Sequence, residues 1–198
     1  MPDLCARFGF DRNRIEQRLA FLYLSKADHN LARRLIAEVI EPNLDTIVEK
    51  FYETLLFHPE SRKLLMSGEV IERLKVTQRH YLLTLGKDFD TEAYFEERLR
   101  IGVTHAIIGL PLNVYQCAYA NLICLISAAF PRSITERSKD YFDLHSFLIK
   151  ITSLGIHITT SIGLASLATD DESETLLRRA DMALYSAKDA GRNRVVVR

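Results

Sequence analysis

The first 150 residues follow a helical pattern of hydrophobic and polar positions almost throughout. Apolar residues recur at spacings of three and four, as on the buried face of an amphipathic helix, and no segment is a convincing strand. Pro42 fits the first turn of a helix, and His58-Pro59 ends that helix because the residue before proline disfavours helical geometry. The predicted helices cover about residues 11–24, 25–39, 42–57, 60–66, 67–85, 91–108, 113–130 and 134–151. About eight helices with short connections predict a mainly α domain over residues 1–155.

The pattern changes near residue 156. Residues 156–163 alternate and are rich in β-branched side chains, which favours a strand. A helical stretch over about 174–190 follows and is ended by Gly191, and residues 194–198 are predicted as a short terminal strand. A strand–helix–strand piece of this size is too small to bury a core by itself. The sequence therefore predicts a second, incomplete α/β unit over residues 156–198.

The charge balance of the chain excludes some classes of partner. Lys+Arg and Asp+Glu both number 26, so the formal net charge is zero. Nucleic acids and anionic membranes both select basic surfaces, so we expect neither as a partner. No apolar stretch approaches the roughly 20 residues that span a bilayer, and the charged N-terminal stretch lacks the apolar run of a secretory signal. We therefore expect a cytoplasmic protein without a membrane partner.

The three cysteines, Cys5, Cys117 and Cys124, form no CxxC pair. Cys117 and Cys124 are seven residues apart in an apolar segment, which places them on similar faces of one helix. We interpret them as small core residues, since a buried free cysteine behaves as a small hydrophobic side chain, with a redox or metal-binding pair as the alternative.

His105 lies in an unusually apolar stretch, IGVTHAIIGLPLNVY, in the last turn of a predicted helix. A hydrogen-bonded core histidine, or one that interacts with the helix end, would explain it without any function. An imidazole buried without a partner costs on the order of 1–3 kcal/mol, so some group must bind it. Iron held in a flat apolar ring would be such a partner, since a single histidine can ligate haem iron in a helical pocket. One histidine leaves both interpretations open.

Two further features could belong to the same pocket. Tyr52 lies on a helix that is otherwise buried through apolar residues. Its phenol is either an ordinary tyrosine at the edge of the core or a donor aimed at a ligand on the far side of the iron. Leu74 and Thr77 are three residues apart, so they share a helix face and could roof a cavity with one apolar and one small polar group.

Three motifs occur along the helical region. They are Phe51-Tyr52-Glu53 with His58-Pro59-Glu60, Glu72-Arg73-Leu74-Lys75 with Thr77-Gln78, and the run RIGVTHAIIGLP over residues 100–111, continuing to Tyr115 and Ala118-Tyr119. In these motifs the region resembles the sensor globin of globin-coupled sensors, the haem-based gas sensors of bacteria and archaea. The resemblance covers all of the helical region, and the RIGxxHxxIGLP pattern is fairly specific.

The resemblance implies a globin-like sensor domain with haem b as cofactor. It implies His105 as the proximal ligand of the iron, Tyr52 as the hydrogen-bond donor to bound O2, Leu74 as a gate beside the gas and Thr77 as a further distal residue. O2 or a related diatomic gas is the implied ligand. Sensor globins of this kind pair through their last two long helices, so we expect a homodimer. A haem-free helical interaction module remains the alternative.

The tail carries motifs of a different kind. They are Thr160-Ser161-Ile162-Gly163-Leu164-Ala165 and the run ADMALYSAKDAGRNR over residues 180–194. These motifs resemble the C-terminal quarter of GGDEF domains, the diguanylate cyclases that join two GTP molecules into cyclic di-GMP. The resemblance implies that Lys188 and Arg192 are vestigial contacts to nucleotide phosphates.

The catalytic part of a GGDEF domain is missing from the sequence. The GG(D/E)EF loop and the earlier metal-binding aspartate are absent from all 198 residues. Phosphoryl transfer of this kind needs Mg²⁺ held by carboxylates and a glycine-rich turn, so we expect no catalytic residues and no cyclase activity. A cyclase-family signalling protein that makes cyclic di-GMP in its complete form is the alternative. The globin and cyclase patterns overlap near residues 154–160, which suggests an internal deletion in a longer sensor cyclase.

Overall fold

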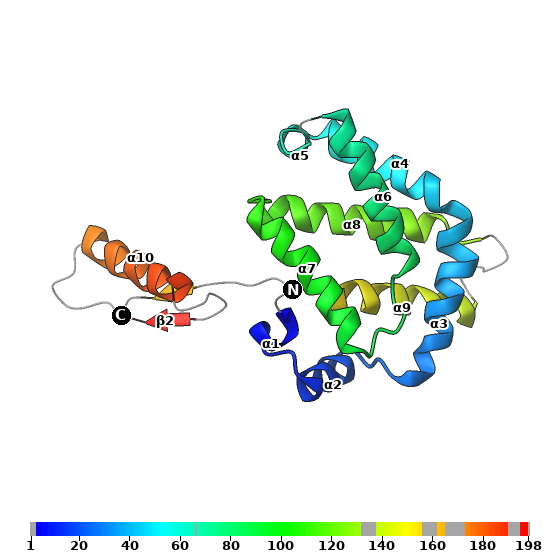
Figure 1. Cartoon of the computed structure of the whole chain (residues 1–198), viewed down its shortest axis with the longest axis horizontal. Coiled ribbons are helices and arrows are strands. Elements are labelled where there is room, and N and C mark those ends of the chain that lie inside the picture. Colours follow the sequence, from blue (N-terminus) through cyan, green and yellow to red (C-terminus); the bar gives the residue numbers. More distant parts are fainter. Residues whose placement is uncertain are drawn as a thin grey trace. The chain divides into compact units, whose positions relative to one another are not determined.

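The structure, a computed structural model, describes residues 3–65, 67–131, 138–155, 162–164, 173–189 and 195–197. It divides into two compact units, residues 1–156 and 157–198. The described part of the first unit is helical, and the second unit combines one helix with two strands (Figure 1). The prediction of a mainly α, globin-like fold is confirmed.

Most helices of the first unit begin and end close to the predicted positions, but α1 was not predicted and α5 is shorter than predicted. They are α1 (Leu4–Phe8), α2 (Arg12–Phe21), α3 (His29–Arg34), α4 (Glu41–Phe57), α5 (Pro59–Arg62), α6 (Gly68–Leu83), α7 (Glu92–Ile107), α8 (Leu112–Ala128) and α9 (Lys139–Gly155). A 3-10 turn, η1 (Lys26–Asp28), precedes α3, and a π-helical segment, η2 (Leu35–Ile40), joins α3 to α4. Asp11, Ser67 and Thr91 cap α2, α6 and α7, each accepting a hydrogen bond from a backbone amide three residues on. Local sequence therefore sets where these helices start.

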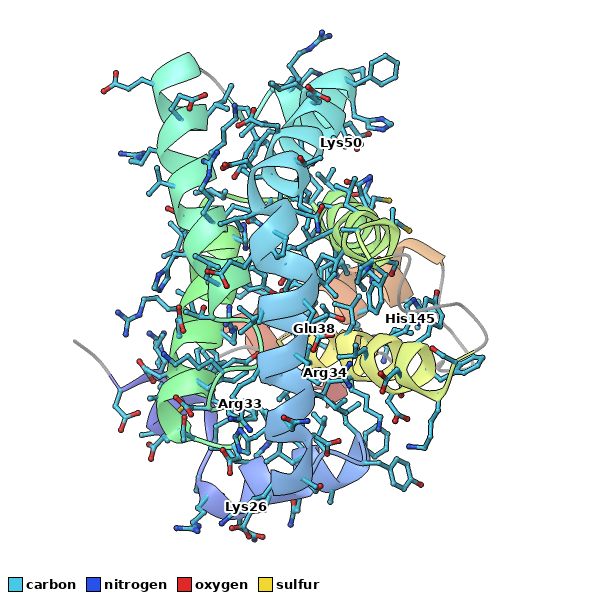
Figure 2. All side chains as sticks on the ribbon, turned by 90° about the vertical axis from the view of Figure 1, so that its right-hand side faces the viewer. Lys26, Arg33, Arg34, Glu38, Lys50 and His145 are labelled. Carbon is cyan, nitrogen blue, oxygen red and sulfur yellow. The ribbon has the colours of Figure 1, made fainter. Side chains whose placement is uncertain are left out.

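The segments α3, η2 and α4 form one continuous helix, which Figure 2 shows as a single column from near Lys26 to Lys50. Pro42 lies in the first turn of α4, as predicted, but no loop precedes it. Proline has no N–H to donate, and its ring clashes with the carbonyl four residues earlier, so a regular α-helix is disrupted there. The helix widens instead, and the amide of Glu41 reaches back five residues to the carbonyl of Ile36.

Two side chains fix this widened helix to the end of the chain's helical region. The Asn43 amide donates to the carbonyl oxygens of Val39 at 2.8 Å and of Ala129, just after α8, at 3.4 Å. The Arg34 guanidinium, labelled in Figure 2, donates two hydrogen bonds of 3.2 Å to the carboxylate of Asp140 in α9. The helix that carries Tyr52 is thus tied to both α8 and α9 on either side of its π-helical segment.

The chain between α6 and α7 turns at Gly86, where φ is +82°. A Cβ added there would lie 3.1 Å from side-chain carbons of both Ile151 and Phe147 in α9. Glycine is therefore favoured for two reasons, the left-handed backbone and the close approach of α9.

The cysteines of α8 are not core residues. Leu122 and Ile126 are the buried residues of this helix, whereas Cys117 and Cys124 are exposed. The prediction that they are small core residues is wrong, because α8 is apolar on nearly all sides and its pattern does not show which side meets the core.

The second unit consists of β1 (Ile162–Leu164), α10 (Ser173–Asp189) and β2 (Val195–Val197). The two strands are parallel, with Ile162 opposite Val195 and Leu164 opposite Val197, and a crossover containing α10 connects them. Most of the strand predicted over 156–163 lies outside the described residues. Among the residues that the structure does describe, no helix is long and apolar enough to cross a membrane.

Candidate functional site

A cavity of about 230 Å³ lies among α4, α6, α7 and α8. It brings together the four residues singled out in the sequence, Tyr52 from α4, Leu74 and Thr77 from α6, and His105 from α7. The rest of the lining is mostly leucine, isoleucine and aromatic side chains. Within the described residues, no Asp, Glu, Lys or Arg lines the cavity. An apolar cavity with a few polar groups is the usual form of a small-molecule or cofactor site.

The end of α7 explains the IGLP part of the motif. Gly109 adopts φ +68°, and its amide donates to the carbonyl of Ala106 at 3.2 Å. The amide of Leu110 donates to the carbonyl of His105 at 3.0 Å. This pair of bonds is a Schellman motif, which needs the left-handed conformation that glycine adopts most easily. The backbone of His105 is therefore fixed by the turn that ends its helix.

The His105 ring is partly buried in the cavity wall. Its Nδ1 is buried and has no hydrogen bond of normal geometry among the described residues, and the nearby backbone acceptor is the carbonyl of Ile101, one turn earlier. Burial lowers the pKa of His105 below its ordinary value of 6.5, and the Ile101 carbonyl opposes this only in part. The ring is therefore neutral near pH 7, and a neutral imidazole keeps one nitrogen lone pair that can bind a metal.

Tyr52 is the polar group that α4 contributes to the cavity. Its side chain is 5% exposed, and its ring meets that of Phe51 edge-on with centroids 5.4 Å apart. Burial raises the pKa of Tyr52 to about 12, so the hydroxyl keeps its proton. Within the described part of the chain the hydroxyl has no hydrogen-bond partner, so it is available as a donor to a bound ligand.

Leu74 and Thr77 differ in what they can offer. Leu74 is half-buried against the core and adds an apolar side to the cavity. The Thr77 hydroxyl donates to the carbonyl of Arg73 at 3.2 Å, the local bond that threonine often makes inside a helix. This hydroxyl is already used, so Thr77 contributes mainly volume to the site.

An ion-pair network holds α6 against α4 beside the cavity. The Lys75 ammonium lies 2.5 Å from the carboxylate of Glu49 and 3.0 Å from that of Glu72. Arg79 pairs with Asp45 at 2.8 Å and also approaches Glu49. The hydrogen bond from Lys75 holds the pKa of the Glu49 carboxyl below its usual range. The network therefore fixes the spacing of the two helices that carry Tyr52 and Leu74.

Three tyrosines at the cavity wall were not predicted as site residues, although two of them, Tyr115 and Tyr119, belong to the motif around His105. The hydroxyls of Tyr81 and Tyr119 are 2.9 Å apart, and both residues line the cavity. Tyr115 joins them, with its ring centroid 5.1 Å from that of Tyr119 and 5.3 Å from that of His105. A signal was present, since Tyr115 and Tyr119 are four residues apart and Tyr81 is seven residues after Leu74, so each shares a helix face with another cavity residue.

The residues predicted as vestigial phosphate contacts are not placed by this structure. Lys188 belongs to α10, but its side chain is outside the part that the structure describes, and Arg192 lies outside the described residues altogether.

Comparison with known proteins gives one matching family and several similar relatives. A family profile described as Protoglobin matches residues 11–165. The "Heme-based aerotactic transducer HemAT" of Halobacterium salinarum is 38% identical over 142 residues, which cover 69% of this chain and 28% of the relative. The "Response regulator PleD" of Caulobacter vibrioides is 31% identical over 114 residues, which cover 57% of this chain and 25% of the relative. The chain thus spans only about a quarter of the length of these relatives.

The match to PleD is longer than the C-terminal unit. It spans 114 aligned residues, whereas the unit comprises residues 157–198, so the similarity must include residues of the helical unit. It therefore does not by itself mark where the second domain begins.

Proposed function

Because the chain belongs to the Protoglobin family, we propose that it binds haem b in the cavity among α4, α6, α7 and α8 and senses O2 or a related diatomic gas. The observation that carries this proposal is that His105 and Tyr52, from different helices, line the same uncharged cavity. The relative that is a haem-based transducer supports it, since the similarity covers most of this chain.

The residues present fit a haem group. The Nδ1 atom of His105 is buried and unpartnered in the described region, and the neutral ring has a nitrogen lone pair that would bind iron. Aromatic and aliphatic walls without a charged side chain suit a flat apolar macrocycle. The cavity is about 230 Å³ and is not fully enclosed, so a bound macrocycle would also extend beyond the enclosed space. When bound, haem supplies an iron with a coordination position for a diatomic gas.

The chain's own residues then have distinct roles. His105, neutral because burial lowers its pKa, would hold the iron. Tyr52 keeps its proton up to a pH of about 12 and would donate a hydrogen bond to a bound gas. Leu74, an apolar part of the cavity lining, would limit the space beside that gas. The Thr77 hydroxyl would have to leave the carbonyl of Arg73 before it could reach a ligand.

We further propose that the protein is a homodimer in the cytoplasm that pairs through α8 and α9. On α8 the exposed side carries Cys117 and Cys124, and on α9 the large side chains of Phe142 and Ile149 are exposed. Two neighbouring helices with small and apolar exposed residues suit association with a second copy.

For the tail, we propose that residues 156–198 derive from a GGDEF cyclase domain and carry no cyclase activity. The parallel strands with a helical crossover and the similarity to PleD are compatible with this origin. The catalytic loop is absent from the sequence, so Lys188 and Arg192 would remain as vestiges of phosphate binding.

The deciding experiment is an absorption spectrum of the full chain after reconstitution with haem. We expect a sharp haem band that responds to O2 in the wild type, and its loss or shift in His105→Ala, with recovery on adding free imidazole. The matched control is His80→Ala, since the His80 side chain is 70% exposed and does not line the cavity. A featureless spectrum in all three proteins would contradict the proposal and select the haem-free interaction module.

A further inference from the structure

Arg98 is a buried cation that the site described above does not use. It is 1% exposed and lies in α7, seven residues before His105. Seven residues are nearly two helical turns, so the two side chains leave the helix on the same face, about 10 Å apart along its axis. A permanent positive charge therefore lies within the same helix face as the proposed iron ligand.

The surroundings of Arg98 compensate its charge only in part. The guanidinium carbon lies 4.4 Å from the ring centroid of Tyr81 and 4.6 Å from that of Tyr94. One terminal nitrogen, Nη2, donates to the carbonyl and hydroxyl oxygens of Thr84, at 3.1 and 3.2 Å. Nε and Nη1 are buried without a hydrogen-bond partner, and no carboxylate in the described part of the chain pairs with Arg98. The charge is held by two aromatic faces and a carbonyl rather than by a counter-ion.

One aromatic ring separates this charge from the cavity. Tyr81, which covers one side of the guanidinium, lines the cavity, and its hydroxyl contacts Tyr119 in the same wall. By contrast, the ion pair of Lys75 and Glu49 brings together opposite charges whose fields largely cancel at a distance. Arg98 is therefore an uncompensated charge next to a low-dielectric site, where its field is weakly screened.

We propose that Arg98 raises the reduction potential of iron bound in this cavity and so favours its ferrous state, the state that binds O2. The inference rests on the proposed function, since it assumes haem in the cavity. Ferric haem carries one more positive charge than ferrous haem, so a buried unpaired cation nearby destabilises the ferric form. The step concerned is the gain of one electron by ferric iron, with the electron supplied by an external reductant. Arg98 does not touch the iron itself. It acts through its electric field across the ring of Tyr81, which lies between the guanidinium and the cavity.

The test is a potentiometric titration of the haem-loaded full chain, in which the absorbance of the haem is recorded as the applied potential is varied. The variants are Arg98→Met and Arg98→Gln, which remove the charge, and Arg98→Lys, which keeps it. At the wild-type midpoint potential, we expect the ferrous-to-ferric ratio to fall on the order of tenfold in the neutral variants and to stay near one in Arg98→Lys. Arg100→Met is the matched control, because Arg100 is half-exposed, pairs with Glu96 at 3.6 Å and is screened by solvent.

A structural effect of the substitutions is separated by two readouts. The expected shift persists at high salt, because a buried charge is screened little, whereas a surface effect disappears. The haem band should keep the wild-type position in all Arg98 variants, since His105 stays in place.

Several results would overturn the role of Arg98. One is a neutral variant that takes up haem and keeps the wild-type midpoint. Another is a fall in Arg98→Lys as large as that in Arg98→Met, because the charge is retained there. If neither neutral variant takes up haem, the midpoint potentials of Arg98→Lys and the wild type are compared. A lower midpoint in Arg98→Lys would then overturn the role of Arg98, because this variant keeps the charge. Failure of the proposed function is distinct, because the wild type itself would then show no haem band.

Discussion

Tyr81 of α6 and Tyr119 of α8 place their hydroxyl oxygens 2.9 Å apart in the wall of the cavity. Burial raises the pKa of both phenols, so both keep their protons and share one hydrogen bond. The bond joins α6, which also carries Leu74, to α8, the helix that follows the one carrying His105. A ligand in the cavity thus contacts a junction between two helices as well as the groups that bind it.

This junction predicts unequal effects of removing the two hydroxyls. Tyr119 has a second polar neighbour in Tyr115, whose ring centroid is 5.1 Å away, whereas the hydroxyl of Tyr81 has no hydrogen bond other than that to Tyr119 in the described residues. Tyr119→Phe leaves the buried Tyr81 hydroxyl without its partner and should lower the free energy of unfolding by about 1–3 kcal/mol. Tyr81→Phe leaves the Tyr119 hydroxyl close to Tyr115, to which it can turn, and should cost less.

Urea denaturation of the two single variants and the double variant measures this asymmetry. We expect the double variant to lose less stability than the sum of the single ones, because the shared bond is counted twice in that sum. Strict additivity would show that the two hydroxyls do not interact.

The Tyr52 hydroxyl should slow the release of bound gas. With haem loaded, we expect Tyr52→Phe to raise the O2 dissociation rate roughly tenfold, the effect of losing one hydrogen bond of about 1.5 kcal/mol. Stopped-flow displacement of O2 by CO measures this rate. Tyr23→Phe is the control, because Tyr23 is 84% exposed and lies outside the cavity. An unchanged rate in Tyr52→Phe would remove Tyr52 from the site.

The buried ring of His105 should make the haem-free protein less stable in acid. Its pKa in the folded state lies below the unfolded value of 6.5, so the unfolded chain binds a proton that the folded chain resists. This contribution is complete above pH 6.5 and is lost as the pH falls below that value towards the folded-state pKa.

Denaturation of the haem-free protein at pH 7.5 and pH 5.5 tests this pH dependence. We expect the wild type to lose more stability between these pH values than His105→Leu, which cannot titrate there. His80→Gln is the control for replacing a histidine outside the cavity, since the His80 side chain is 70% exposed. Equal losses in the wild type and His105→Leu would show that His105 is not buried as a neutral ring.

Gly86 and Gly68 form a matched pair for testing the turn before α7. Gly86→Ala places a methyl group against Phe147 and Ile151 at a left-handed φ, so we expect a loss of about 2–4 kcal/mol in unfolding free energy. Gly68→Ala adds its methyl group at the start of α6, where nothing lies within 4 Å, and should be neutral or stabilising by up to about 1 kcal/mol. Chemical denaturation compares them, and a neutral Gly86→Ala would mean that α9 lies farther from this turn.

The sequence was sufficient for the helices and for the first residues of the site, and insufficient for contacts that depend on tertiary packing. Apolar spacing and proline positions located α4 and α6, and motif similarity picked out His105 and Tyr52, which share the cavity. The direct run of α3 into α4 was missed, because Pro42 indicates the start of a helix, whereas here a π-helical segment accommodates the proline within a continuous one. The exposed side of α8 was misassigned, because periodicity carries no signal in a helix that is apolar all round.

Arg98 shows a different limit. Its charge and helical position predict a solvated side chain, and only the placement of Tyr81 and Tyr94 on both sides of the guanidinium makes it a core residue. Such an arrangement depends on residues from different helices, so no local sequence pattern predicts it.

The π-helical segment between Arg34 and Pro42 also affects how related chains should be aligned. A π-helical turn is equivalent to one residue inserted into an α-helix, and each residue of an α-helix turns the chain by about 100°. A relative with a regular helix here would need one residue fewer to present its tyrosine to the same cavity. The gap would belong within residues 35–40, and an alignment that placed it after Pro42 would match Tyr52 with a neighbour pointing elsewhere. Site residues of such relatives are therefore best numbered from the proline onwards.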